Sequence, residues 1–408
     1  MNPPRFAKFL FLASIIGALP VQAGIVRFNA TIDGTQAGTN STATGTAVML
    51  YDVTANKLDI SITLSDFAAT LSNSHIHEGT AGTIVVPFGN ETLYTRTGNT
   101  LTATFTNLSY TGSPQALLHG DAYINFHTAA FPAGEIRGQL IPEKVKLAAI
   151  ITGAQETPAT ASTAYGAAQA TYDPVTDKID VLISVYNFTN TFSNSHIHES
   201  TGTGVPGGVV VPFGNASAYV QNGTTYTQLF TGLGYSTSAG TGTPGNPVNL
   251  LSEKAYVNVH SNVNAGGEIR GQLYVLDSGN PGRLVNVSAR AQVGTGNNVL
   301  ISGMYVQGTD PVRVLVTARG PSIASLISGT LADPVLSVHD VNNHTLFTND
   351  NVGTAPFQSL ITGFTGVSFQ PAESGVLLVL PPGGYTGVVS GAGDTTGIAL
   401  AEAFEVQW

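Results

Sequence analysis

The chain of 408 residues contains no cysteine and little charge. Without cysteine there are no disulfides, no thiol chemistry and no cysteine-ligated metal, so stability must come from hydrophobic cores large enough to fold unaided. Charged residues make up 10% of the chain, and 25 Asp and Glu outnumber 15 Lys and Arg. Since no basic run is present to neutralise phosphates, we expect no nucleic-acid partner.

Long apolar runs are also scarce. The first 23 residues, "MNPPRFAKFLFLASIIGALPVQA", place two basic residues before an apolar stretch at residues 9–19. This pattern is typical of a secretory signal peptide, so we expect cleavage near Ala23 and a secreted or cell-surface location. No other stretch approaches the roughly 18 apolar residues of a membrane-spanning helix, and we expect no membrane-spanning segment in the mature chain.

An internal repeat organises the first two thirds of the chain. The string "SNSHIHE" begins at Ser72 and again at Ser193, and "GEIRGQL" begins at Gly134 and again at Gly267. The offset grows along the repeat, so insertions fall between the repeated blocks, as loop insertions do. Each unit has the length of a domain rather than of a short solenoid repeat. We therefore predict two similar domains, at residues 24–142 and 145–275.

The hydrophobic pattern predicts an all-β fold. Within each unit apolar residues alternate with polar ones, as in "KLDISITLS" from Lys57, which indicates antiparallel strands with one wet face. Clusters of Gly, Pro, Asn and Ser separate these segments, which favours two tandem Greek-key β-sandwich or barrel domains. The same strand pattern continues through residues 283–408, but with different sequence motifs. We predict a third β-sandwich domain there, after a linker at residues 276–282.

Six of the nine histidines recur in register between the two units. On a strand, residues two apart share a face about 6.6 Å from one another, so the histidines of His-x-His lie side by side and the intervening Ile76 points into the core. A downstream strand brings a third histidine in each unit. The candidate metal ligands are His75, His77 and His127 in the first unit and His196, His198 and His260 in the second. Three imidazoles favour copper or zinc.

Two interpretations of these histidines remain open. In one they bind a metal ion, with Glu78 and Glu199 as a fourth ligand or as acceptors that orient an imidazole. In the other they hydrogen-bond to Asn, Glu and backbone groups at the rim of a sheet and fix the following loop. Both interpretations fit the spacing.

The repeated "GEIRGQL" string predicts a second local feature. Glu135 and Arg137 share a face of their strand, as do Glu268 and Arg270. We predict a structural ion pair in each unit. A substrate-binding role for the arginines is the alternative.

The repeated motifs resemble a known family. "SHIHEG" at Ser74–Gly79 and "AYINFHTAAFPAGEIRGQL" at Ala122–Leu140, with their second copies, are similar to the CHRD domain, a module named after chordin and frequent in exported bacterial proteins. The resemblance covers roughly residues 24–275. It implies a β-rich extracellular module.

Two further resemblances are weaker. "SHIHEG" is similar to the His-x-His-Glu stretch of copper/zinc superoxide dismutases, which implies copper-ligand roles for the six histidines. The chain lacks the histidines that would hold zinc and bridge the two metals, so we expect no dismutase activity. "ARGPS" at Ala318 and "LPPGGYTGVV" at Leu380 resemble C-terminal β-sandwich modules of exported bacterial proteins.

No catalytic template is complete in the sequence. The nucleophile elbow Gly-x-Ser-x-Gly, a phosphate-binding Gly-rich loop with Lys and the His-Glu-x-x-His helix are all missing. We therefore expect an exported, non-enzymatic binding or structural protein whose partner is a protein or carbohydrate at the cell surface. The alternative is a metalloprotein that holds copper or zinc once per unit, with a redox or metal-buffering function.

Overall fold

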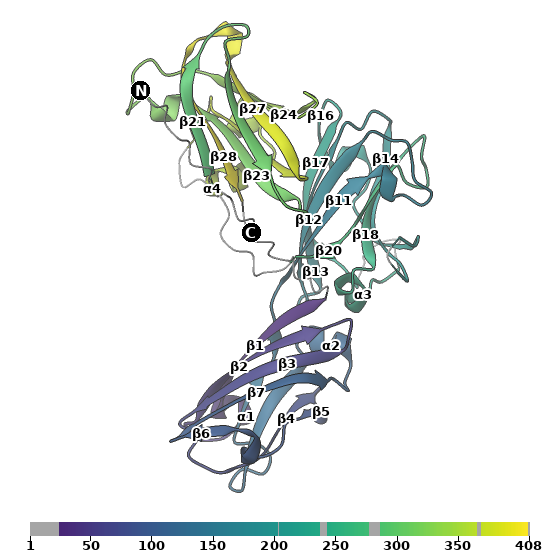
Figure 1. The fold of residues 1–408 in the computed structure, drawn as a ribbon, viewed down its shortest axis with the longest axis vertical. Helices are drawn as coiled ribbons and strands as arrows, with labels where there is room; N and C mark the ends of the chain where they lie inside the picture. The colour runs from purple at the N-terminus through teal and green to yellow at the C-terminus, as the bar shows by residue number, and fades with distance from the viewer. Residues whose placement is uncertain (1–23, 203, 237–242, 277–285, 365–368, 407–408) are drawn as a thin grey trace, which may run out of the picture.

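The computed structural model describes residues 24–202, 204–236, 243–276, 286–364 and 369–406. The expected signal peptide lies outside these residues, as does the linker apart from its first residue. Figure 1 shows three groups of strands in chain order, with the second group between the first and the third. Among the described helices, none has the length and apolar character needed to cross a membrane.

The first domain is a single antiparallel sheet of ten strands that curls into a half-barrel. Histidine-bearing β4 and β8 are neighbours in this sheet although they are far apart in the chain. The strands in spatial order are β5 (Thr83–Pro87), β4 (Leu71–Glu78), β8 (Ala122–Thr128), β9 (Ile136–Gln139), β1 (Ile25–Asp33), β2 (Thr44–Asp52), β3 (Lys57–Ser65), β7 (Thr100–Ser109) and β6 (Thr95–Thr97), with β10 (Ile141–Pro142) also pairing with β1.

The second domain repeats this sheet strand for strand, which is the structural counterpart of the sequence repeat. The strands in spatial order are β15 (Gly208–Pro212), β14 (Phe192–Glu199), β18 (Ala255–Ser261), β19 (Ile269–Gln272), β11 (Val145–Thr152), β12 (Tyr165–Asp173), β13 (Lys178–Tyr186), β17 (Thr225–Gly234) and β16 (Val220–Asn222), with β20 (Tyr274–Val275) pairing with β11.

The third domain consists of two four-stranded antiparallel sheets. One contains β21 (Asn286–Val293), β28 (Gly397–Glu405), β23 (Val312–Arg319) and β26 (Ser374–Leu380). The other contains β22 (Leu300–Val306), β27 (Gly383–Gly391), β24 (Pro334–Asp340) and β25 (Thr345–Asn349). The prediction of an all-β fold is confirmed.

The described helices are short connectors. The α-helices are α1 (Gly34–Ala37), α2 (Pro114–Leu118), α3 (Pro247–Leu251) and α4 (Gln358–Phe364); the 3-10 turns are η1 (Glu91–Leu93), η2 (Gly153–Gln155), η3 (Ala216–Ala218), η4 (Pro321–Ile323), η5 (Val352–Thr354) and η6 (Ala392–Asp394). Helix α2 begins with the usual features of a helix N-terminus: the Ser113 side chain accepts from the N–H of Ala116, and a proline occupies the first turn. Asn246 caps α3 in the same way.

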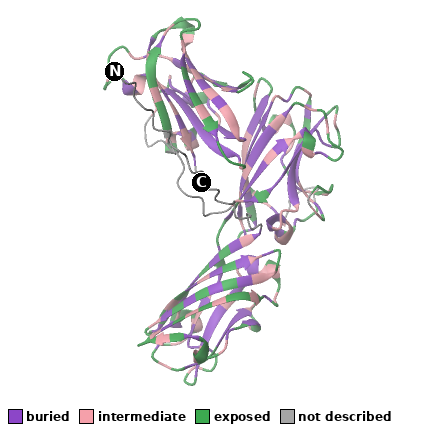
Figure 2. Ribbon diagram, viewed as in Figure 1, coloured by how far each residue is buried: buried purple, intermediate pink, exposed green. Residues whose placement is uncertain are grey.

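Alternation along the strands builds the cores. In β3 the side chains of Leu58, Ile60, Ile62 and Leu64 are no more than 2% exposed, whereas the intervening Asp59, Ser61 and Thr63 are exposed. Figure 2 shows the buried residues concentrated along the strands of all three domains. The apolar residues predicted to point inward therefore form the core. The polar residues that alternate with them lie on the opposite face of the strand.

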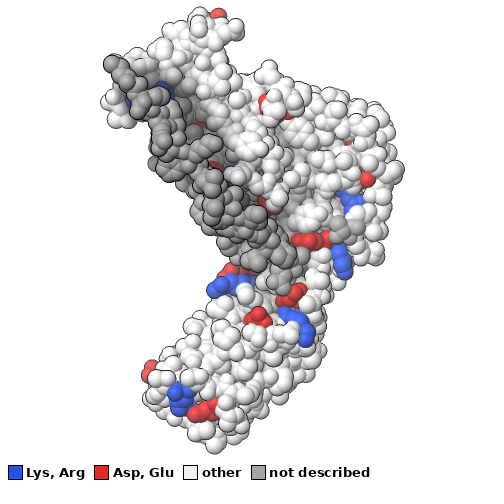
Figure 3. Space-filling view, in the orientation of Figure 1, with Lys and Arg blue, Asp and Glu red and all other residues white. Residues whose placement is uncertain are grey.

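The outer faces of the two repeated sheets differ. Where the first domain exposes Ser61, the second has Leu182, which is 0% exposed because β26 of the third domain packs on β12 and β13. The hydroxyl of Tyr186 donates to the carbonyl of Val379 at 2.8 Å across this contact. The third domain therefore rests on a sheet face that the first domain leaves in water. The face of the molecule in Figure 3 carries few charged side chains, in keeping with the composition.

Candidate metal centres

The three candidate histidines of the first domain meet on one face of neighbouring strands. His75 and His77 lie on β4, with the fully buried Ile76 between them pointing into the core, and His127 lies on β8. The ring centroids are 4.7 Å apart for His75 and His77, 4.5 Å for His75 and His127, and 6.1 Å for His77 and His127. One ligand nitrogen from each ring lies within 4.8 Å of the other two.

The second domain reproduces this cluster on β14 and β18. Its centroid distances are 4.8 Å for His196 and His198, 4.6 Å for His196 and His260, and 6.0 Å for His198 and His260. Its ligand nitrogens also lie within 4.8 Å of one another. Both sets of three histidines predicted from sequence therefore converge in space.

Backbone carbonyls fix the tautomer of two rings in each cluster. Nδ1 of His77 lies 2.6 Å from the carbonyl oxygen of Gly82, and Nδ1 of His127 lies 2.9 Å from that of Pro132. A carbonyl oxygen only accepts, so each Nδ1 carries the hydrogen and each Nε2 presents a lone pair. In the second domain the carbonyls of Gly207 and Ala265 hold His198 and His260 in the same way, at 2.9 and 3.0 Å.

The lone pairs point into the cluster, and one in each domain has no partner. Nδ1 of His75 donates to Nε2 of His77 at 2.9 Å, whereas the buried Nε2 of His127 contacts no hydrogen-bond donor. His260 Nε2 is unsatisfied in the same manner in the second domain. A buried acceptor without a donor costs free energy, and a metal ion removes that cost.

Burial favours the neutral form of His75, of His77 and of the three histidines of the second domain. It lowers the pKa of His75 to about 4 and that of His196 to about 3, with repulsion from the neighbouring imidazoles adding to the effect. The pKa values of His77, His198 and His260 are lowered by burial as well. Neutral imidazole is the form that binds metal.

The two glutamates beside the histidines face the other way. The Glu78 carboxylate accepts from the hydroxyl of Tyr110 at 2.6 Å and from the N–H of Ser113 at 2.8 Å. Glu199 accepts from Tyr235 and from Asn246 in the second domain. Adjacent residues of a strand point to opposite faces, so both carboxylates lie outside the histidine clusters and neither is a candidate fourth ligand.

The "GEIRGQL" strings form no ion pair of the predicted kind among the described residues. Glu135 accepts instead from Ser41 and Thr128, each at 2.8 Å, and Glu268 accepts from Ser162 and Asn190. The glutamate directly precedes β9 or β19, and its carboxylate turns toward these hydroxyl and amide donors. The prediction of a same-face pair with Arg137 or Arg270 was therefore wrong.

Each arginine instead covers an aromatic ring beside the histidines. The Arg137 guanidinium carbon lies 4.3 Å from the ring centre of Tyr123, whose ring is stacked on His77 at 5.0 Å. Arg270 lies 3.4 Å from the ring centre of Tyr256, which is stacked on His198 at 4.9 Å. The sequence analysis considered these arginines only for an ion pair or for substrate binding and missed this stack, because the pairing of β9 with β8 is not visible in the string.

Comparison with known families accounts for the repeat. The family model described as the CHRD domain matches residues 28–140 and 147–273, more than half of the chain. The chain belongs to the CHRD family. The two CHRD domains coincide with the two curled sheets, and each contains one histidine cluster.

Other comparisons add little to the CHRD assignment. No curated protein matches the chain. Among solved structures, the exo-β-1,3-galactanase from Phanerochaete chrysosporium is 9% identical over 93% of this chain and 81% of that chain, with a TM-score of 0.16, which is too low to carry an argument. The resemblance to copper/zinc superoxide dismutase finds no support in these comparisons.

Proposed function

We propose that each CHRD domain binds one transition-metal ion, copper or zinc, through its three histidines. The observation that supports this most strongly is the unsatisfied, buried Nε2 of His127 and of His260, aimed into a cluster where a second Nε2 lone pair already points. Fixation of the outer nitrogen by a carbonyl is the usual support of a metal-binding histidine.

The dimensions of the cluster suit a metal ion. Metal–nitrogen bonds of about 2.0–2.1 Å at tetrahedral angles place ligand nitrogens roughly 3.3 Å apart. His75 Nδ1 and His77 Nε2 are 2.9 Å apart, so the two rings need to separate by only a few tenths of an ångström. The hydrogen on His75 Nδ1 must leave that nitrogen, and the neutral ring can carry it on Nε2.

We further propose that the protein works outside the cytoplasm, in keeping with the basic and apolar pattern of residues 1–23. Three neutral nitrogens and an open fourth position suit metal capture or buffering. We assign no reaction to the centres. N-terminal sequencing of protein recovered outside the cell would test export; an intact Met1 there would contradict cleavage near Ala23.

Elemental analysis of purified protein loaded with copper or zinc tests metal binding. We expect two equivalents per chain, one in His75→Ala/His77→Ala, one in His196→Ala/His198→Ala, and none in the combined variant. The matched control is His339→Ala, since His339 bonds to Ser337 and Thr345 in the third domain. Metal-free protein after loading, or a loss of metal in the control, would contradict the proposal.

A further inference from the structure

The two centres differ in the charge that surrounds them. Resting on the proposed metal sites, we propose that the first centre takes a small anion at its metal ion and that the second binds the anion more weakly, because Arg137 lacks the nearby buried carboxylate that Glu156 provides for Arg270.

The two arginines occupy equivalent places. Each lies on the strand next to the histidine strand β8 or β18, and each covers the tyrosine that is stacked on a histidine. Burial is the main cause of the lowered pKa of His77 and of His198, and the positive charge of the arginine adds a smaller lowering in each case, so both guanidinium groups lie within electrostatic range of the ligand set.

Glu156 has no counterpart in the first domain. The glutamines before it and before Ala37 make identical bonds: Gln155 and Gln36 each donate to a carbonyl of their own β-strand and each accept from the equivalent N–H of the arginine-bearing segment. Position 37 is therefore the structural equivalent of position 156. Alanine stands at one and a glutamate that is 9% exposed stands at the other.

The Glu156 carboxylate is placed over the second centre's side of the sheet. A Cβ on Gly267 would lie 2.5 Å from Glu156 Oε1 and 2.8 Å from Asn258 Nδ2, so only glycine leaves room for this carboxylate. Asn258 pairs with both His196 and Arg270 in the sheet register. The Glu156 carboxylate thus lies near Asn258, the residue opposite His196 in the sheet. Burial raises the pKa of Glu156, and attraction to Arg270 partly offsets that rise.

Arg137 has an acidic neighbour in register, but that group is engaged elsewhere. Asp33 is the β1 partner of Arg137, yet its carboxylate accepts from the backbone and side-chain nitrogens of Gln36 at 2.8 and 3.0 Å. Within the described chain no ion pair joins either Arg137 or Arg270 to a carboxylate, so the difference between the centres is the nearby charge of Glu156, which acts on Arg270 without a close contact. Three neutral imidazoles leave the full charge on a bound divalent ion, so the first centre has a net positive field that favours an anion at the open position.

The experiment compares azide binding to the two centres of the full chain loaded with copper(II). His196→Ala/His198→Ala isolates the first centre and His75→Ala/His77→Ala isolates the second, and the azide-to-copper charge-transfer band reports occupancy. Burial raises the pKa of Glu156 to about 7, so the titration is run at pH 8, where its carboxylate is charged. We expect azide to bind the first centre about tenfold more tightly, which is the order of magnitude expected from one nearby charge that no opposite charge offsets.

Reciprocal variants assign the difference to the named residues. Arg137→Gln should lower azide affinity at the first centre to the level of the second, and Glu156→Gln, which keeps the shape of the side chain, should raise affinity at the second. Equal affinities in the parent centres, or an unchanged affinity in Arg137→Gln with copper retained, would overturn the inference while leaving metal binding intact. Failure to bind copper at all would overturn the proposed function and this inference together.

Discussion

The imidazole of His77 lies flat against the ring of Tyr123, with centroids 5.0 Å apart and planes inclined by 14°. His198 and Tyr256 repeat this arrangement at 4.9 Å and 8°. The two residues face each other directly across β4 and β8, so the stack follows from strand register. Together with the carbonyl bond to its Nδ1, the stack restricts His77 to one ring plane.

Removing the stacked ring should weaken metal binding without removing a ligand. We expect Tyr123→Leu to lower the metal affinity of the first centre by roughly tenfold, as loss of an orienting neighbour does, whereas Tyr123→Phe keeps the ring and should stay near the parent. Competition with a chelating dye on protein lacking the second centre measures both. If Tyr123→Phe lowers the metal affinity as much as Tyr123→Leu does, the hydroxyl and not the ring stack supports the centre.

Glu78 should affect stability and not metal content. Glu78→Ala leaves the hydroxyl of Tyr110, a residue that is 2% exposed, without its acceptor, and we expect a loss of roughly 1–3 kcal/mol in the free energy of unfolding. The metal stoichiometry should remain two. Denaturant unfolding of metal-free protein and elemental analysis give the two readouts, and loss of one metal equivalent would return Glu78 to the ligand set.

The second centre should keep its metal below the usual titration range of histidine. The pKa values of its three rings are all lowered from 6.5, that of His196 to about 3, so protons compete only at lower pH. The unfolded chain takes up these protons near pH 6.5, hence metal-free stability should fall as pH drops from 6.5 toward 3. A pH titration of metal release with a midpoint at or above 6.5 would contradict this.

Much of the candidate site was predictable from the sequence because the repeat samples it twice. His-x-His on a strand fixes a shared face, and recurrence of His127 as His260 identified the third ligand. The same alternation rule already sends Glu78 to the opposite face from His77, a signal that the ligand hypothesis overlooked. By contrast, the place of Glu156 depends on how the curled sheet brings the end of β11 over β18, which no local pattern records.

The sequence of β13 also indicates the contact between the second and third domains. Strand β13 is buried along nearly its whole length, whereas β3 alternates with exposed polar residues. A strand that is apolar on both faces is covered on both faces. Leu182 and Tyr186 are the residues that indicate this second covered face. Which element packs on it cannot be predicted from the repeat, because that element belongs to the third domain.

Matched substitutions at one repeat position should measure that contact. Leu182→Ala removes a fully buried side chain between domains and should cost roughly 2–4 kcal/mol. Ser61→Ala, at the equivalent exposed position of the first domain, should change stability by no more than about 0.5 kcal/mol. Urea unfolding, with limited proteolysis as the probe of the third domain, compares the two variants. Similar unfolding midpoints for both variants would argue against a stabilising interface.

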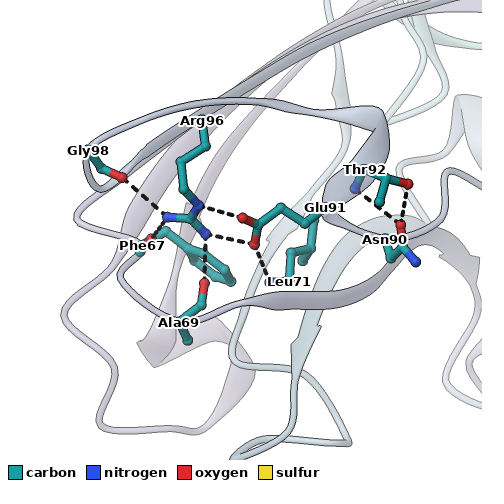
Figure 4. A network of polar contacts seen from close by, with 8 residues as sticks. All are labelled: Phe67, Ala69, Leu71, Asn90, Glu91, Thr92, Arg96 and Gly98. Carbon is teal, nitrogen blue, oxygen red and sulfur yellow. Dashed lines mark hydrogen bonds and ion pairs between the residues drawn. The ribbon is translucent and has the colours of Figure 1, made fainter.

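The last prediction concerns the ion pair between Arg96 and Glu91 in the first domain. Arg96 makes a double hydrogen bond to the Glu91 carboxylate, at 2.6 and 2.9 Å, and also donates to the carbonyls of Phe67 and Ala69, as Figure 4 shows. It thereby ties the β6 hairpin to the loop before β4. The second domain has Gln221 at the equivalent position.

Arg96→Met should therefore destabilise the first domain by roughly 1–3 kcal/mol at neutral pH, with Gln221→Met as the near-neutral control. The hydrogen bond from Arg96 lowers the pKa of Glu91 from 4.5 to about 2. A carboxylate with a lowered pKa contributes stability above its unfolded value, and that contribution disappears as pH falls from 4.5 to about 2. The difference between parent and Arg96→Met should shrink across this window in unfolding measured by circular dichroism, and a constant difference would show that the carbonyl bonds alone account for the role of Arg96.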